Sequence, residues 1–289
     1  MNSHKLYNII KDITPPVIFR AVKRSSFYGA MARGVKKISG SEYIPVWNTI
    51  NCGLLKGYYF FCDSKGGWQS EMLNGTYDKF LFDYVEKLDL KNKTIFDIGT
   101  HVGYHSLYFS KLVGKDGKVY AFEPNIFNID RIKLNLSKNE NIKNIYLNEE
   151  AVSDQNGEEE FLFSDNIEGG TSSGGFLGNS DPLWEKNIYI NETEFKKVKV
   201  KTVTLDSLIE TNSKNKPALL KIDVEGAENL IMKGGMKFLN EYKPTILIEI
   251  HSMFNMFVVL KALNELGYKV ELLKKENDGR CFIVAEFKN

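Results

Sequence analysis

Residues 94–103 read Thr-Ile-Phe-Asp-Ile-Gly-Thr-His-Val-Gly, and this stretch decides the fold. Its β-branched, apolar beginning favours a buried strand, and Gly99 interrupts the run just before helical periodicity starts at Val102. The pattern predicts a strand, a tight glycine turn and a helix. The first N–H groups of a helix lack partners within the helix, and glycine lets a ligand approach the backbone closely. We therefore predict a site for an adenosine-bearing cofactor at this turn, with Glu123 at the end of the next strand contributing to it.

Strands and helices alternate along the rest of the chain. Apolar runs typical of buried strands alternate with segments of helical periodicity, which predicts an α/β fold with a mostly parallel sheet. The last two strands flank Asp278-Gly279 and predict a closing antiparallel hairpin. Valines alternating with lysines over residues 198–203 indicate an exposed edge strand. The expected strands are residues 94–98, 118–123, 145–147, 218–222, 245–250, 270–273 and 282–285.

The N-terminal part and the middle of the chain differ in composition from the strands and helices of the predicted sheet. Residues 1–40 carry eight lysines and arginines against the single acid Asp12, and Pro15-Pro16 interrupts their helical pattern. We expect residues 1–70 to be a basic helical arm or cap, packed on its own domain, mediating a homodimer or lying on an anionic membrane surface. Residues 71–289 form the main domain. Within it the irregular residues 164–195 are expected to be a substrate-loop insertion.

Overall composition narrows the class of protein. The 289 residues with 43% hydrophobic content suffice for one large domain. A formal net charge of +1 argues against a dedicated nucleic-acid binder. Three cysteines without CxxC spacing fit a reduced compartment, and no run approaches the roughly 20 apolar residues of a membrane span. We expect a cytoplasmic protein, with membrane association through the arm as the alternative.

The glycine turn favours S-adenosylmethionine over a dinucleotide. A dinucleotide turn would read GxGxxG and place backbone N–H groups against a pyrophosphate, but here the pattern is Asp97-x-Gly99-x-x-x-Gly103. S-adenosylmethionine has no phosphate and carries a cationic sulfonium and amino group, which Asp97 could serve directly or through water. Glu123 could accept hydrogen bonds from both ribose hydroxyls, and Glu150 or its neighbours could meet the adenine amino group. The structural alternatives are a helix cap for Asp97 and a solvated strand end for Glu123.

On several segments the chain resembles the FkbM-type S-adenosylmethionine-dependent methyltransferases, over roughly residues 93–252. The segments that carry the resemblance are residues 96–104, 121–124, 150–154, 203–206, 220–228 and 248–251, of which Lys-Ile-Asp-Val-Glu-Gly at 221–226 is the most specific. The resemblance implies a class I methyltransferase fold, a Rossmann-like seven-stranded sheet whose last strand is antiparallel. His101 departs from the family pattern, in which a small or amide side chain is more common. The residues expected to bind cofactor are Asp97, Gly99, His101, Gly103, Glu123, Pro124, Asn125, Glu150, Ala151 and Asp223.

Candidate catalytic residues follow two later strands. Asp223 and Glu225 come after residues 218–222, and His251 ends the next strand, at the sheet edge where α/β proteins bind ligands. Methyl transfer is an in-line displacement that needs the acceptor held close and helped to lose its proton. His251 is the first candidate base, since a reference pKa of about 6.5 leaves it neutral at pH 7. Asp223 is the second. The alternative for His251 is that it orders the loop.

The same residues suggest a metal site, and the family resemblance suggests a reaction. Asp223, Glu249 and His251 offer oxygen and nitrogen ligands for a divalent ion such as Mg²⁺, which could lower the pKa of an acceptor hydroxyl. The resemblance implies O-methylation of a sugar, expected in a surface polysaccharide or glycolipid. The alternatives are a small-molecule or lipid O-methyltransferase and a non-catalytic, cofactor-binding scaffold.

Overall fold

The computed structural model describes residues 45–64, 67–164, 175–180, 195–209, 216–276 and 279–287. The chain divides into two compact units, Met1–Ile44 and Pro45–Asn289. The first unit, which holds most of the predicted basic arm, lies outside the described residues. So does most of the predicted insertion at residues 164–195. The dimer, membrane and substrate-loop predictions attached to these segments therefore stay predictions.

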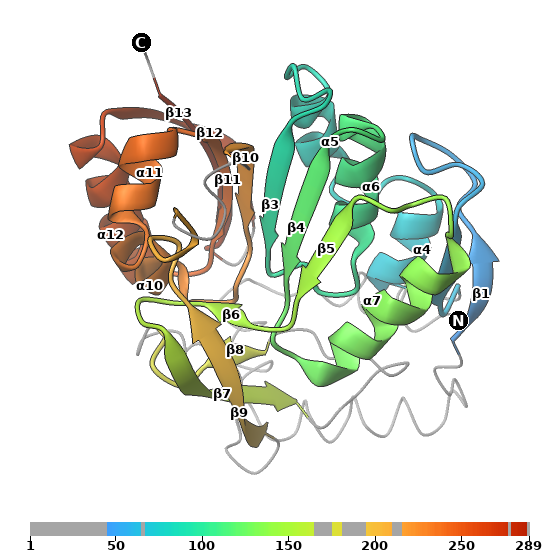
Figure 1. Ribbon diagram of the computed structural model, residues 1–289, viewed down its shortest axis with the longest axis horizontal. Helices are drawn as coiled ribbons and strands as arrows, with labels where there is room; N and C mark the ends of the chain where they lie inside the picture. The colour runs from blue at the N-terminus through green and yellow to red at the C-terminus, as the bar shows by residue number, and fades with distance from the viewer. Residues whose placement is uncertain are drawn as a thin grey trace, which may run out of the picture. The chain divides into compact units, whose positions relative to one another are not determined.

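A mixed sheet of seven strands forms the core of the second unit, in the order β12-β13-β11-β10-β3-β4-β5 (Figure 1). The run from β11 to β5 is parallel, and β13 pairs antiparallel with both β11 and β12. The predicted parallel sheet and closing hairpin are confirmed. The strands are β3 (Thr94–Ile98), β4 (Lys118–Phe122), β5 (Ile145–Asn148), β10 (Pro217–Ile222), β11 (Thr245–Ile250), β12 (Tyr268–Lys275) and β13 (Cys281–Phe287).

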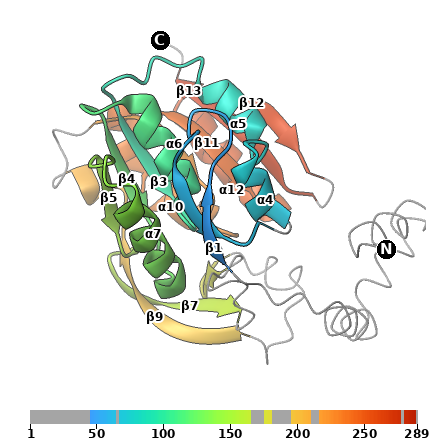
Figure 2. The same ribbon diagram turned by 90° about the vertical axis from the view of Figure 1, so that its right-hand side faces the viewer.

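Helices cover both faces of this sheet because its strands are apolar on both sides. On β3, Phe96 and Ile98 pack into one core together with α10, α11 and α12. Ile95 points the other way, into a second core with α4, α5 and α6. Figures 1 and 2 show these helices and α7 around the sheet. The helices are α4 (Gly67–Leu73), α5 (Lys79–Val85), α6 (Tyr104–Val113), α7 (Ile126–Lys138), α10 (Glu228–Lys233), α11 (Met236–Tyr242) and α12 (Met253–Glu265).

None of the helices among the described residues has the length and apolar character needed to cross a membrane.

A second, smaller sheet has the order β6-β9-β7-β8. Strand β9 pairs with β7 along residues 195–202 and with β6 only at Thr202 and Val203, so residues 198–201 form the predicted edge and the end of the strand is paired on both sides. The valine–lysine alternation marks a strand with one exposed face, and it does not report whether both edges are paired. The strands are β6 (Ala151–Val152), β7 (Gly157–Ser164), β8 (Phe176–Leu177) and β9 (Phe195–Val203).

An antiparallel hairpin of β1 (Val46–Thr49) and β2 (Tyr59–Cys62) begins the described chain. Ile50 and Phe60 are buried in the same core as α4, α5 and α6. The hairpin and α4 therefore belong to the compact unit that starts at Pro45, whereas the sequence analysis places residues 46–70 with the arm.

Helix α7 holds the free edge of β2 with its side chains. Asn135 Oδ1 accepts a hydrogen bond from the Phe61 N–H at 2.9 Å, and Asn139 Oδ1 accepts one from the Tyr59 N–H at 3.0 Å. Asn139 Nδ2 donates to the Tyr59 carbonyl at 2.8 Å, and Arg131 Nη1 donates to the Phe61 carbonyl at 2.7 Å. One helical turn rises about 5.4 Å and two strand residues span about 6.6 Å, so side chains four apart on the helix can serve alternate strand residues.

Candidate active site

A pocket of about 530 Å³ opens where β3, β4, β10 and β11 end. Most of the side chains selected from the sequence meet there. Asp97, Gly103 and His251 are absent from its lining, and all three are taken up below. The predicted residues that line the pocket are Gly99, His101, Glu123, Pro124, Asn125, Glu150, Ala151, Asp223, Glu225 and Glu249.

The glycine turn after β3 is pressed against the end of β10. Gly99 has a φ of +75°, and a Cβ atom at this position would lie 1.8 Å from the Asp223 carbonyl oxygen. The N–H groups of Gly99 and Thr100 both donate to the Phe122 carbonyl, at 3.0 and 3.1 Å. Only glycine fits this conformation and this approach. Gly103, also at positive φ, precedes the first turn of α6 and packs on Ile132 behind the pocket.

Asp97 supports the turn from behind. Its side chain is fully buried, and Oδ2 accepts hydrogen bonds from Thr100 Oγ1 at 2.7 Å and Ser106 Oγ at 2.6 Å. Its Oδ1 lies 3.3 Å from Lys221 Nζ. Asp97 therefore has no exposed surface that could contact a ligand directly. Its hydrogen bonds hold the turn in place.

Lys221 ties the turn to the end of β10, a function that the sequence analysis missed. Its buried Nζ donates to the Gly99 carbonyl at 2.8 Å and lies 3.5 Å from Asp223 Oδ2. Burial opposes the charge, but Asp97 and Asp223 outweigh it and raise the pKa of Lys221 above its ordinary value. The sequence at residues 221–226 indicates such ion pairs, because a lysine buried in an apolar strand requires acidic partners that are buried with it.

Glu123 sits at the end of β4 with its oxygens turned toward backbone and amide donors. It accepts hydrogen bonds from the His101 N–H at 2.9 Å, the Asn125 N–H at 3.0 Å and Asn128 Nδ2 at 3.2 Å. Burial raises the pKa of Glu123 to about 7 in spite of these donors. Burial also lowers the pKa of His101 to about 4, so its ring, 5.1 Å from that of Trp68, is neutral.

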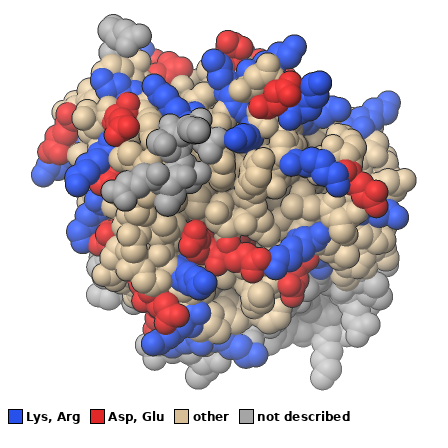
Figure 3. Space-filling view, viewed as in Figure 1, with Lys and Arg blue, Asp and Glu red and all other residues tan. Residues whose placement is uncertain are grey.

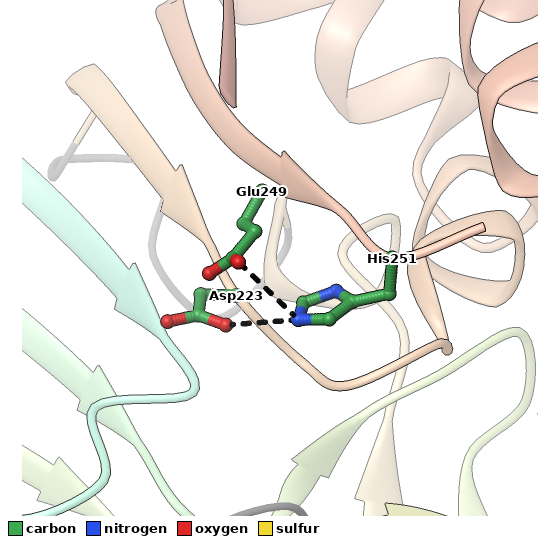
Figure 4. Close-up of side chains that lie close together, drawn as sticks. All are labelled: Asp223, Glu249 and His251. Atoms are coloured by element: carbon green, nitrogen blue, oxygen red, sulfur yellow. Dashed lines mark ion pairs between the residues drawn. The ribbon is translucent and has the colours of Figure 1, made fainter. Parts of the chain in front are cut away.

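Four carboxylates surround the fully buried side chain of His251, and Figure 4 shows two of them, Asp223 and Glu249, facing Nε2. Nε2 lies 3.4 Å from Glu225, 3.7 Å from Asp223 and 3.8 Å from Glu249. Nδ1 lies 2.6 Å from Glu228, which begins α10. Burial would lower the pKa of His251, but the carboxylates raise it to about 10. Without a metal His251 is thus an imidazolium at pH 7, and the expectation of a neutral base is wrong.

The carboxyl groups at the pocket have different acidities. Burial would raise the pKa of Asp223, but Lys221 and His251 lower it below its ordinary value. Burial raises the pKa of Glu225. Burial, followed by the charge of Asp223, raises the pKa of Glu249 to about 8. Of Asp223, Glu225 and Glu249, Asp223 is therefore the one whose pKa its neighbours hold below the ordinary value.

The cluster also has the chemistry of a metal site. One ligand atom each from Asp223, Glu249 and His251 lies within 4.8 Å of the others. A histidine that binds a metal through one ring nitrogen commonly donates the other N–H to a carboxylate, and Glu228 at Nδ1 is placed to accept it. The residues present therefore fit a divalent cation at Nε2, in the place of the imidazolium proton.

Three further residues, Trp68, Tyr77 and Arg280, line the pocket. Trp68 of α4 and Tyr77, which precedes α5, form an aromatic wall, with ring centroids 6.5 Å apart. Arg280 precedes β13, and its Nη1 lies 3.0 Å from Glu249 Oε1. The rule that parallel strands end at one sheet edge does not predict the position of Arg280, because β13 is antiparallel to β11. An antiparallel strand starts at the edge where its parallel neighbour ends, as the pair Ile250 and Cys281 shows.

Charge on the surface is mixed on the face shown in Figure 3. A group of acidic side chains lies near the middle of that face, and lysines and arginines lie to both sides of it.

Comparison with known proteins places this geometry in a family. The model of the methyltransferase FkbM domain matches residues 97–270. The hexuronic acid methyltransferase AglP of Haloferax volcanii is 25% identical over 233 residues, which are 77% of this chain and 81% of the relative.

Solved structures are more distant. An FkbM methyltransferase from Methylobacillus flagellatus KT is 15% identical with a TM-score of 0.48, over 68% of this chain and 44% of that protein. This chain thus spans less than half the length of that relative. An S-adenosylmethionine-dependent O-methyltransferase from Thermotoga maritima is 14% identical with a TM-score of 0.43, over 80% of this chain and 74% of its own.

Proposed function

Since this chain belongs to the methyltransferase FkbM family and is an S-adenosylmethionine-dependent methyltransferase, we propose that it transfers the methyl group to a hydroxyl of a sugar in a polysaccharide or glycolipid. One observation carries the proposal. A single pocket joins Glu123, suited to a ribose, to the carboxylates Asp223, Glu225 and Glu249, suited to an acceptor hydroxyl. The sugar in the name of the Haloferax relative supports the acceptor class.

The cofactor is proposed to lie between the glycine turn and the end of β4. Gly99 lets it approach the backbone, and Glu123 accepts hydrogen bonds from the ribose hydroxyls. Glu150 and Ala151 lie on the pocket wall at the start of β6, where they would meet the adenine. The acids around the pocket favour a ligand with a sulfonium and an ammonium group.

Asp223 is proposed as the group that receives the acceptor's proton. It is ionised, lines the pocket and follows the strand beside the glycine turn. As the acceptor oxygen bonds to the methyl carbon, the carbon–sulfur bond breaks and its electron pair stays on sulfur, while the hydroxyl proton passes to Asp223. His251 then acts as a positioning residue that keeps Asp223 charged, and Glu225 accepts a second hydrogen bond from the acceptor.

A divalent cation at Asp223, Glu249 and His251 is proposed as a second component. When bound it would lower the pKa of the acceptor hydroxyl. Because the set includes an imidazole, Mn²⁺ should bind at least as well as Mg²⁺. Activity that falls in a chelator and returns with Mn²⁺ would support the ion, and full activity in the chelator would refute it.

The test of the function separates cofactor binding from turnover. Calorimetry should show S-adenosylmethionine binding to the wild type and to Asp223→Asn, and weak binding to Glu123→Ala. Methyl transfer from labelled cofactor to a glycan extract should be lost in Asp223→Asn and kept in Asp116→Asn, an exposed acid in the α6–β4 turn. Label in a lipid or small-molecule fraction would favour those acceptors. Cofactor binding without any turnover would favour a scaffold, and no binding at all would refute the proposal.

A further inference from the structure

The pocket contains one cation beside the carboxylates that face the acceptor. Among the described residues that line it, five are acids and Arg280 is the sole lysine or arginine. Its side chain is 34% exposed, whereas that of Glu249, its ion-pair partner, is 9% exposed. The guanidinium therefore lies between the buried cluster and the open part of the pocket.

The hairpin of β12 and β13 fixes Arg280 at this position. Cys281, the next residue, pairs with Ile250 at the end of β11, one residue before His251. Arg280 thus lies immediately before a strand that starts at the sheet edge where β10 and β11 end. Its carbonyl accepts a hydrogen bond from the Glu276 N–H at 2.9 Å, which ties it to the end of β12.

An aromatic wall adjoins the same hairpin. Tyr77 and Trp68 line the pocket, and Tyr77 comes three residues before Phe80. The Phe80 ring packs edge-on against Phe282, two residues after Arg280, with centroids 4.8 Å apart. The aromatic segment and the arginine strand are therefore neighbours. Aromatic faces cover the apolar face of a sugar ring, and an arginine fork matches the two oxygens of a carboxylate.

We infer that Arg280, with Tyr77 and Trp68, forms an acceptor subsite for a sugar that carries a carboxylate. The inference rests on the proposed function and adds the acceptor's charge to it. The sugar ring lies on the aromatic wall, its carboxylate binds Arg280, and a ring hydroxyl reaches Asp223. Glu249 orients the guanidinium from the buried side.

The test compares two sugars that differ only in this group, D-glucuronate and its neutral amide, D-glucuronamide. Both are titrated into the full chain saturated with S-adenosylhomocysteine. Loss of a charge-assisted hydrogen bond corresponds to roughly a tenfold change in affinity or more, so the wild type should prefer glucuronate by about that factor. Arg280→Gln should remove the preference, and Arg280→Lys should keep part of it.

The control is Lys269→Gln, which removes one exposed positive charge from the same hairpin at a position outside the pocket lining. It should keep the full preference. Equal binding of the two sugars to the wild type, no saturable binding of glucuronate, or an unchanged preference in Arg280→Gln would each overturn the inference. S-adenosylhomocysteine affinity, measured first on each variant, reports folding. If the wild type fails to bind that nucleoside, the proposed function itself has failed.

Discussion

Replacing Lys221 with methionine should greatly lower the free energy of unfolding, although the two side chains have nearly the same shape. The substitution removes the 2.8 Å hydrogen bond to the Gly99 carbonyl and leaves Asp97, which has no exposed surface, without its positively charged partner. Thr100 and Ser106 still donate to Asp97, but neither carries a charge.

The magnitude follows from burial. Removing one partner of a buried ion pair costs about 3–5 kcal/mol, because the remaining charge keeps its desolvation penalty. Lys221 faces two carboxylates at 3.3 and 3.5 Å, and Asp97 is the more buried of them. We expect a loss of about 3–5 kcal/mol in the free energy of unfolding. Lys221→Met combined with Asp97→Asn should lose less than the sum of the single variants, by about 1–3 kcal/mol.

The assay is urea unfolding followed by circular dichroism, with the free energy extrapolated to water. Lys233→Met is the matched control, since Lys233 also pairs with an aspartate, Asp154, but is exposed. It should be indistinguishable from the wild type. A cost below about 1 kcal/mol for Lys221→Met, or strict additivity in the double variant, would refute the reasoning.

Three further predictions concern the cofactor side of the pocket and the hairpin. Gly99→Ala should abolish cofactor binding in calorimetry, because its Cβ would lie 1.8 Å from a backbone oxygen; binding close to the wild-type value would contradict this. Cofactor affinity should rise between about pH 6 and 8 as Glu123 ionises, and calorimetry should show a weaker rise in Glu123→Gln. Because folding raises the pKa of Glu123 from 4.5 to about 7, its contribution to the stability of the ligand-free protein should fall between these pH values, and urea unfolding at each of them checks the sign. Asn139→Ala should cost about 1–3 kcal/mol in urea unfolding, since it leaves the Tyr59 N–H and carbonyl without their partner, whereas exposed Asn141→Ala should cost much less.

Much of the fold and half of the site could be predicted from the sequence. The strand, glycine turn and helix at residues 94–113 follow from local periodicity and from Gly99, and Glu123 follows from its place at the end of the next strand. These inferences succeed because parallel strands bring their carboxyl ends to one edge. The position of Asp223 and Glu249 beside the turn follows from the same rule.

The remaining part depends on contacts that sequence spacing does not encode. The charge of His251 is set by Glu225 and Glu228, which reach it from the start of α10. A reference pKa therefore gives the wrong protonation state. Arg280 and Tyr77 enter the pocket through a hairpin and through the segment before α5, and neither is marked by a motif. The alternation at residues 198–203 indicates an exposed edge, and it does not show that β6 pairs with the last two of these residues.

On β2, the side-chain amides of Asn135 and Asn139 bind only main-chain groups. Asn135 accepts from the Phe61 N–H, and Asn139 binds both the N–H and the carbonyl of Tyr59. Arg131 and Lys138 of α7 also lie over the Phe61 and Tyr59 rings, but substitution of these rings would leave the main-chain hydrogen bonds in place, whereas substitution of either asparagine would remove them. The segment that follows the hairpin carries Trp68 and Tyr77 into the pocket. The main-chain hydrogen bonds that hold the hairpin are thus separate from the two aromatic side chains that the next segment places in the pocket.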